Sequence, residues 1–119
     1  MERTRILLVE LPPMLRDIIA ETIAMEPDME VVAEVPDASS LMSSFERTEV
    51  GVVVVGRDDP SLASMLLAQH PQLKILAVAN HGRESSLYEM RPQREPLGEI
   101  SPQRLVEEIR KAAREQADA

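Results

Sequence analysis

The sequence predicts an α/β domain whose parallel sheet of five strands is doubly wound, with helices covering both faces. Five short apolar runs recur along the 119 residues, and the segments between them repeat apolar residues at helical spacing. This alternation is typical of a (βα)₅ unit, because strands buried on both faces appear as continuous hydrophobic runs. We expect one domain over residues 1–119, with a core at 4–113 and a frayed tail at 114–119.

The first two strand–helix units carry clear signals. The first strand is predicted at residues 6–9, followed by a helix that begins near Pro12 and ends before Pro27. The second strand is predicted at residues 30–35, and Asp37 is suited to cap the helix after it. Both helices repeat apolar residues on the face expected to be buried. These residues are Leu15, Ile18, Ile19, Thr22 and Ile23 in the first helix and Ala38, Leu41, Met42 and Phe45 in the second.

The third unit contains the most hydrophobic run. Residues 50–55 are expected to form the central strand, and a third helix opens at Pro60. That helix ends near His70, where a polar or cationic residue complements the helix dipole. Residues 74–79 supply the fourth strand.

The pattern weakens after the fourth strand, since residues 82–96 contain few apolar positions. We predict a short helix at residues 86–90 and a short, interrupted fifth strand at 96–100. Ser101 then caps a clear last helix. Right-handed crossovers order the strands 2-1-3-4-5, the flavodoxin-like arrangement with a weakened fourth helix and fifth strand. A ligand crevice is expected beyond the carboxyl ends of strands one and three.

Composition excludes several classes of function. The chain has no cysteine, which excludes disulfides, thiolate metal sites and cysteine nucleophiles. Its net charge of −8 argues against nucleic acid as a direct ligand, because such binding requires clustered Lys and Arg. No export signal or apolar run of membrane-spanning length is present, so we expect a cytoplasmic protein without membrane contact.

These segments together resemble the receiver domain of two-component response regulators, in particular receivers of the nitrate-regulator type. The resemblance covers residues 4–113 and rests on the order and spacing of short motifs. They are Ile6-Leu7-Leu8-Val9-Glu10, Glu26-Pro27-Asp28-Met29-Glu30-Val31-Val32-Ala33-Glu34, the segment from Val52 to Pro60, His70-Pro71-Gln72-Leu73-Lys74-Ile75-Leu76, and Ser101-Pro102-Gln103-Arg104-Leu105. Proline four residues after the acceptor position, here Pro60, is also frequent in the family.

The chemistry of the family needs an acidic pair, a phosphoacceptor aspartate, a hydroxyl and a lysine at the carboxyl ends of the strands. The resemblance assigns these roles to Glu10 and Leu11, to Gly56, to Ala79 and to Gly98, in that order. Four of the five required side chains are therefore missing, and the aromatic switch position falls on Glu95. We interpret the chain as a degenerate pseudo-receiver.

A site without nucleophile, metal pair or cation has no means to position a phosphoryl group or neutralise its charge. We therefore expect neither catalysis nor a bound cofactor or metal. One alternative stays open: Glu10, Asp58 and Asp59 could form a cation site at the crevice. The competing interpretation is a solvated Glu10 and a polar turn in which one aspartate caps the next helix.

Two further features have more than one interpretation. His81 follows the fourth strand on the crevice side, either as a catalytic group or as a surface loop residue. Tyr88 is either an exposed anchor or part of the core. The seven methionines are interpreted as core filling.

The function hypothesis follows from the resemblance. In receivers, the surface of helix four, strand five and helix five mediates dimers and partner docking. The corresponding residues are Leu87, Tyr88, Met90, Arg91, Arg94, Arg104 and Lys111. We expect a phosphorylation-independent signalling module that contacts a histidine kinase, regulator or output protein, or a second copy of itself. The alternatives are a domain that binds a divalent cation or a small phosphorylated ligand, and the N-terminal half of a DNA-binding regulator.

Overall fold

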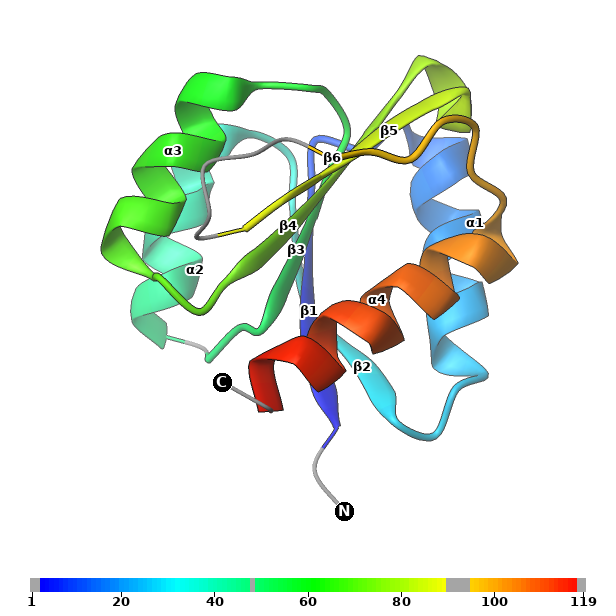
Figure 1. The fold of residues 1–119 in the computed structure, drawn as a ribbon, viewed down its shortest axis with the longest axis horizontal. Helices are drawn as coiled ribbons and strands as arrows, with labels where there is room; N and C mark the ends of the chain where they lie inside the picture. The colour runs from blue at the N-terminus through cyan, green and yellow to red at the C-terminus, as the bar shows by residue number, and fades with distance from the viewer. Residues whose placement is uncertain (1–2, 48, 90–94, 118–119) are drawn as a thin grey trace.

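A computed structural model describes residues 3–47, 49–89 and 95–117 of the chain. One sheet lies between two layers of helices (Figure 1). The strands are β1 (Thr4–Val9), β2 (Met29–Val35), β3 (Val52–Val55), β4 (Lys74–Ala79), β5 (Glu84–Tyr88) and β6 (Glu95–Pro96). The helices are α1 (Pro13–Ala24), η1 (Ala38–Ser40), α2 (Leu41–Arg47), α3 (Pro60–Gln69), η2 (Asn80–Gly82) and α4 (Pro102–Ala117).

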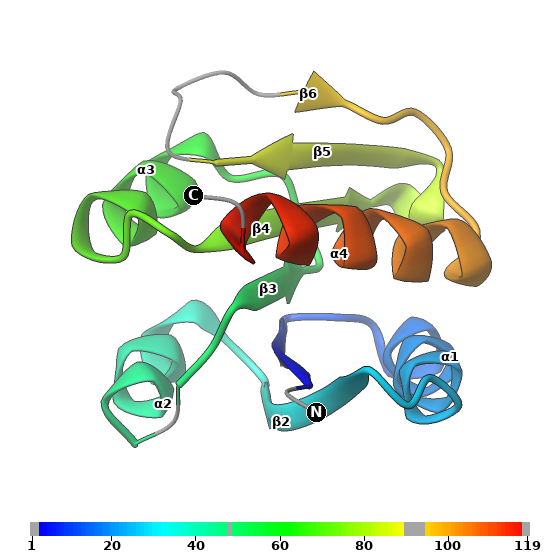
Figure 2. The same ribbon diagram turned by 60° about the horizontal axis from the view of Figure 1, so that its bottom comes forward.

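The sheet has the order β2-β1-β3-β4-β5-β6, with β2 at one edge and β6 at the other (Figure 2). The pairs β1–β2, β1–β3 and β3–β4 are parallel, as predicted. The predicted order 2-1-3-4-5 is confirmed. A fully parallel sheet is not, because β5 runs antiparallel to β4 and β6 runs antiparallel to β5.

The helix predicted at residues 86–90 is wrong, since this stretch lies largely within β5. Its side chains alternate between the two faces of the sheet, with Leu87 in one core cluster and Tyr88 in the other. Just four residues separate β4 from β5. Because a parallel crossover needs a dozen or more residues, a connection this short returns the chain antiparallel. Gly82 permits the tight turn with its left-handed φ of 93°.

The fifth strand predicted at residues 96–100 is also corrected. Its place beside β4 is taken by β5, and the strand near Pro96 is the two-residue β6 at the sheet edge. The last helix is confirmed, and the backbone N–H of Arg104 donates to the Ser101 hydroxyl at 3.2 Å. This helix continues to Ala117, four residues into the segment expected to fray.

Two hydrophobic clusters hold the layers together, one on each face of the sheet. The first joins α1 and α4 to residues such as Ile6, Val54 and Leu76. The second joins α2 and α3 to the alternate strand residues, such as Leu7 and Val53. No helix among the described residues is long and apolar enough to cross a membrane.

Arg110 forms ion pairs that link α4 to the turn between α1 and β2. Its guanidinium donates to both carboxylate oxygens of Asp28, at 2.9 and 3.2 Å, and to Glu26. The hydrogen bonds from Asp28 and then Glu26 raise the pKa of Arg110 above its ordinary value. A bidentate arginine fixes orientation as well as distance, so this contact sets where α4 lies on the sheet.

Candidate functional site

The candidate site is the rim where β1 and β3 end side by side. The N–H of Gly56 donates to the carbonyl of Val9 at 2.9 Å, and that of Glu10 donates to Val35 at 3.1 Å. Glu10 has a left-handed backbone, with φ of 53°. The rim therefore brings together Glu10 and Gly56, two of the positions that the sequence singled out.

No side chain fits at position 56 in this arrangement. A Cβ atom on Gly56 would lie 2.1 Å from the carbonyl oxygen of Glu10 and 3.0 Å from the Cα of Leu11. Both obstacles are backbone atoms, which cannot move aside as a flexible side chain would. Leu11, the second acidic position, is buried. The space beside Gly56, the position that the resemblance assigns to the acceptor aspartate, is thus filled by the loop after β1.

Arg57 supplies a positive charge that the sequence analysis missed. Its Nε lies 3.0 Å from Oε2 of Glu10, and its Nη2 lies 3.2 Å from Oδ2 of Asp59. The other oxygen of Asp59 accepts from the N–H of Leu62 at 3.1 Å and so caps α3. The signal in the sequence was an arginine directly after Gly56, next to two aspartates.

Asp58 is directed toward a different partner. The hydroxyl of Tyr88 donates to its carboxylate, so β5 is tied to the loop between β3 and α3. Glu10 and Asp59 therefore share Arg57 while Asp58 is bonded to Tyr88, and no group of three such side chains in the described part of the chain could hold a metal ion. The one-aspartate cap that we considered is present at Asp59.

The hydroxyl and lysine positions do not complete the site. Ala79 ends β4 and is paired with Glu84 of β5. Gly98 follows β6, so β5 separates it from β4, and its carbonyl accepts from the Ser85 hydroxyl at 2.7 Å. Even a lysine at position 98 would begin one strand farther from Gly56 than the alignment implied. The side chain of Glu95, the switch position, is not among those described.

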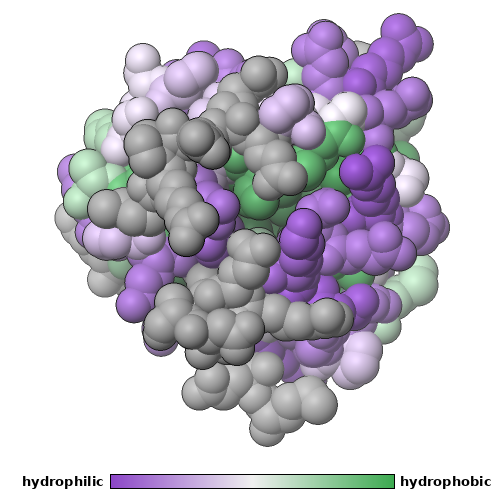
Figure 3. Space-filling model, viewed as in Figure 1, coloured by the Kyte–Doolittle hydropathy of each residue, from purple (hydrophilic) through white to green (hydrophobic). Residues whose placement is uncertain are grey.

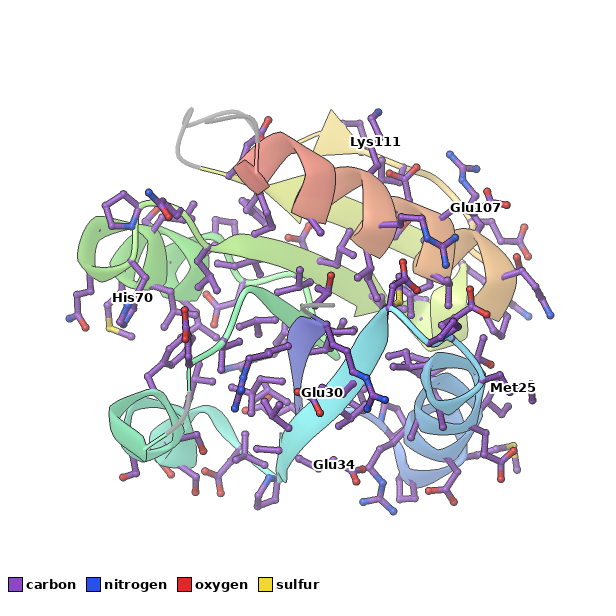
Figure 4. The ribbon with its side chains drawn as sticks, turned by 90° about the horizontal axis from the view of Figure 1, so that it is seen from below. Met25, Glu30, Glu34, His70, Glu107 and Lys111 are labelled. Carbon is purple, nitrogen blue, oxygen red and sulfur yellow. The ribbon has the colours of Figure 1, made fainter. Side chains whose placement is uncertain are left out.

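Of the seven residues expected at the interface, two are buried, two are exposed and three lie outside the described residues. Leu87 and Tyr88 are 4% and 8% exposed, so they pack in the core, which corrects their assignment to an exposed surface. Met90, Arg91 and Arg94 lie outside the described residues. Arg104 and Lys111 are exposed on α4. Figure 4 shows Lys111 and Glu107 pointing outward from this helix, and the surface over it is mainly hydrophilic in Figure 3.

His70 lies away from the rim. The backbone N–H of His70 caps α3 through Leu66, and its ring stacks on Phe45 with centroids 4.5 Å apart. It borders a groove at the opposite, amino-terminal end of the strands, together with Arg5 and Glu30. The backbone of His81 belongs to η2, while its side chain is not among those described.

No family model and no curated protein matches this chain. Solved structures do match it. The chain is similar to the signal receiver domain of an HD domain-containing protein from Pseudomonas fluorescens Pf-5, with a TM-score of 0.74 and 17% identity, over 99% of this chain and 100% of that one. It is also similar to the receiver domain of the stress response regulator RcsB from Escherichia coli, with a TM-score of 0.59, 15% identity and 65% of each chain covered.

A third similar structure is the RcsB response regulator of Salmonella typhimurium, with a TM-score of 0.60 and 16% identity. The match covers 66% of this chain and 44% of the Salmonella chain, so it spans less than half of that regulator. At these identities the likeness concerns the fold. The chain has the α/β fold of response-regulator receiver domains, with an antiparallel β4–β5 pair.

Proposed function

We propose that this chain is a pseudo-receiver of nitrate-regulator type, a signalling module that acts by contact with another protein and without phosphorylation. Its receiver fold supports a role in two-component signalling, in the cytoplasm. Its partner would be a histidine kinase, a regulator, an output protein or a second copy of the chain. We assign it no enzymatic activity, metal or cofactor, and no direct contact with nucleic acid or membrane.

The observation that carries the proposal is the contact between Gly56 and the backbone of Glu10. Phosphoryl transfer needs a nucleophile with free approach and a cation beside it. At this rim the carbonyl of Glu10 occupies the place of the acceptor side chain. Arg57 is already paired with Glu10 and Asp59, so its charge is not directed at a ligand.

The outer face of α4 is the part of the expected docking surface that lies among the described residues. Arg104 and Lys111 are seven residues apart and therefore share one face of this helix. Arginine is favoured at interface hot spots because its planar donor group makes several oriented hydrogen bonds. The exposed Arg104 thus replaces Tyr88 as the preferred anchor.

The test combines phosphorylation with partner capture. The chain is incubated with acetyl phosphate and Mg²⁺ beside an ordinary receiver domain, and intact masses are measured. We expect an adduct on the ordinary receiver alone. Immobilised chain should then capture the same partner with or without acetyl phosphate, and Arg104→Glu should weaken that capture. Gln69→Glu, which adds one negative charge on the exposed face of α3, serves as the control for charge outside α4.

An acid-labile, Mg²⁺-dependent adduct on this chain would refute phosphorylation independence. Equal loss of capture in Arg104→Glu and Gln69→Glu would refute the α4 surface and point to a general effect of charge.

A second candidate is that the chain forms the regulatory part of a longer DNA-binding regulator. The match to the RcsB response regulator of Salmonella typhimurium favours it. That structure is described in terms of DNA interaction, and the match covers 44% of its chain. The complete reading frame at the genomic locus tests it directly. A frame that encodes a DNA-binding domain supports this candidate, and a frame without one excludes it.

A further inference from the structure

We infer that Arg57 is an internal counter-ion that holds the two crevice loops together, so that their closed arrangement needs no bound cation or ligand. The two loops are residues 10–12, after β1, and residues 56–59, after β3, and we call the contact of Glu10, Arg57 and Asp59 the rim clasp. The inference rests on the proposed function for its biological meaning. The opening of the two loops is measured by an experiment that does not depend on that function.

The rim clasp joins two separate anchors. Glu10 is fixed to the end of β2 by its N–H bond to Val35. Asp59 is fixed to the first turn of α3 by its bond from Leu62. Arg57 bridges the two through different nitrogens of one guanidinium, at 3.0 and 3.2 Å. Opening either loop must therefore break a contact of Arg57.

The electrostatics explain why an arginine is suited to this position. Glu10 and Asp59 have side chains that are 23% and 27% exposed, so each carboxylate is partly withdrawn from water. Two such carboxylates near one another repel unless a positive charge lies between them. A guanidinium offers several donors in a fixed plane and keeps its charge at every physiological pH. Arg57 offsets one of the two negative charges and so weakens their repulsion without any ion from solution.

The rim clasp also explains the tight contact at Gly56. Residues 56 and 57 are adjacent, so holding Arg57 against Glu10 also holds Gly56 against the Glu10 carbonyl. In this arrangement the loops are closed in the resting protein. A partner would then meet the rim mainly in this closed conformation.

The experiment measures backbone amide hydrogen exchange in the intact chain. Four proteins are compared: wild type, Arg57→Gln, Arg57→Lys and Arg16→Gln. Arg16 is the matched control, because it also contacts two carboxylates, Asp17 and Glu34, and its side chain is 41% exposed, against 54% for Arg57. Arg57→Lys retains the charge but lacks the planar set of donors that reaches both carboxylates.

We expect exchange in segments 10–12 and 56–62 to be faster in Arg57→Gln by about threefold, the size that small surface ion pairs allow. Arg57→Lys should restore part of the protection, and Arg16→Gln should leave both segments unchanged. Excess Mg²⁺ should not slow exchange there in the wild type.

Equal exchange in Arg57→Gln and Arg16→Gln would overturn the rim clasp, as would slower wild-type exchange in Mg²⁺. Either result leaves the proposed function intact as long as acetyl phosphate produces no adduct. Conversely, an adduct on the wild type would end the proposed function while the exchange data still decide whether Arg57 holds the loops.

Discussion

The parallel region, residues 4–79, and the antiparallel region, residues 84–89 and 95–98, build the same sheet in different ways. In the parallel region, central strands such as β3 have side chains no more than 3% exposed and are joined by helices on both faces. In the antiparallel region, β5 buries two hydroxyls, Ser85 and Ser86, and is joined to β4 by just four residues. The first region is built by apolar burial, and the second relies more on hydrogen bonds.

The difference shows that one strand–helix unit of this architecture is replaceable. The edge of β4 needs a partner for its backbone groups, and an antiparallel strand satisfies it as fully as a parallel one. The face of the sheet on which α1 lies remains covered, because α4 packs there on the first hydrophobic cluster. The positions that the resemblance assigned to the lysine and to the acceptor therefore fall in different regions, Gly98 in the antiparallel one and Gly56 in the parallel one.

The largest expected effect comes from adding a side chain where the parallel region is tightest. Gly56→Asp would force its Cβ against the Glu10 carbonyl, and we expect a loss of about 3 kcal/mol or more in the free energy of unfolding in urea. It should also fail to gain phosphorylation. Gly98→Ala is the comparison in the other region. A Cβ atom there would meet no atom within 4 Å, so just the left-handed backbone, with φ of 74°, disfavours the substitution. It should cost about 1 kcal/mol. Equal costs would contradict the difference in packing.

A smaller effect is expected at the link between the two regions. Tyr88→Phe removes the hydroxyl that reaches Asp58 from a largely buried ring, and we expect a loss of about 1–2 kcal/mol in urea unfolding. A double-mutant cycle with Asp58→Asn separates the bond from the packing of the ring. If the two changes add without any coupling energy, the bond does not connect the regions.

The smallest effect concerns a local contact within the parallel region. The Ser39 hydroxyl, at 2.6 Å, and then the Ser40 N–H, at 3.0 Å, hold the pKa of Asp37 below its usual 3.8. A lowered pKa stabilises the fold above that usual value and loses its effect as the pH falls through the folded pKa. The stability difference between wild type and Asp37→Asn should therefore shrink below pH 3.8, which chemical unfolding across an acid series measures. A difference that is constant with pH would exclude a charge effect.

The fold was predictable wherever the hydrophobic period was strong. Strands β1 to β4 and the last helix were recovered because their apolar runs and caps are local signals. The prediction of a helix at residues 86–90 was wrong. The five residues of β5 include two serines and match neither the helical nor the strand period of apolar residues, and the turn before them decides the direction of the chain. At the candidate site, the roles of Leu11, Gly56 and Ala79 were assigned from the resemblance and stay predictions, whereas Arg57 was overlooked because its role depends on the loop that it contacts.

The amino-acid sequence alone determined the α/β class and the order of the first four strands, since both depend on local periodicity. The tertiary structure alone decided that the Glu10 carbonyl lies against Gly56, that Tyr88 is buried with its hydroxyl on Asp58, and that Arg57 lies between two carboxylates. These three facts require atoms far apart in the chain to be placed within a few ångströms, and no pattern along the sequence encodes such distances.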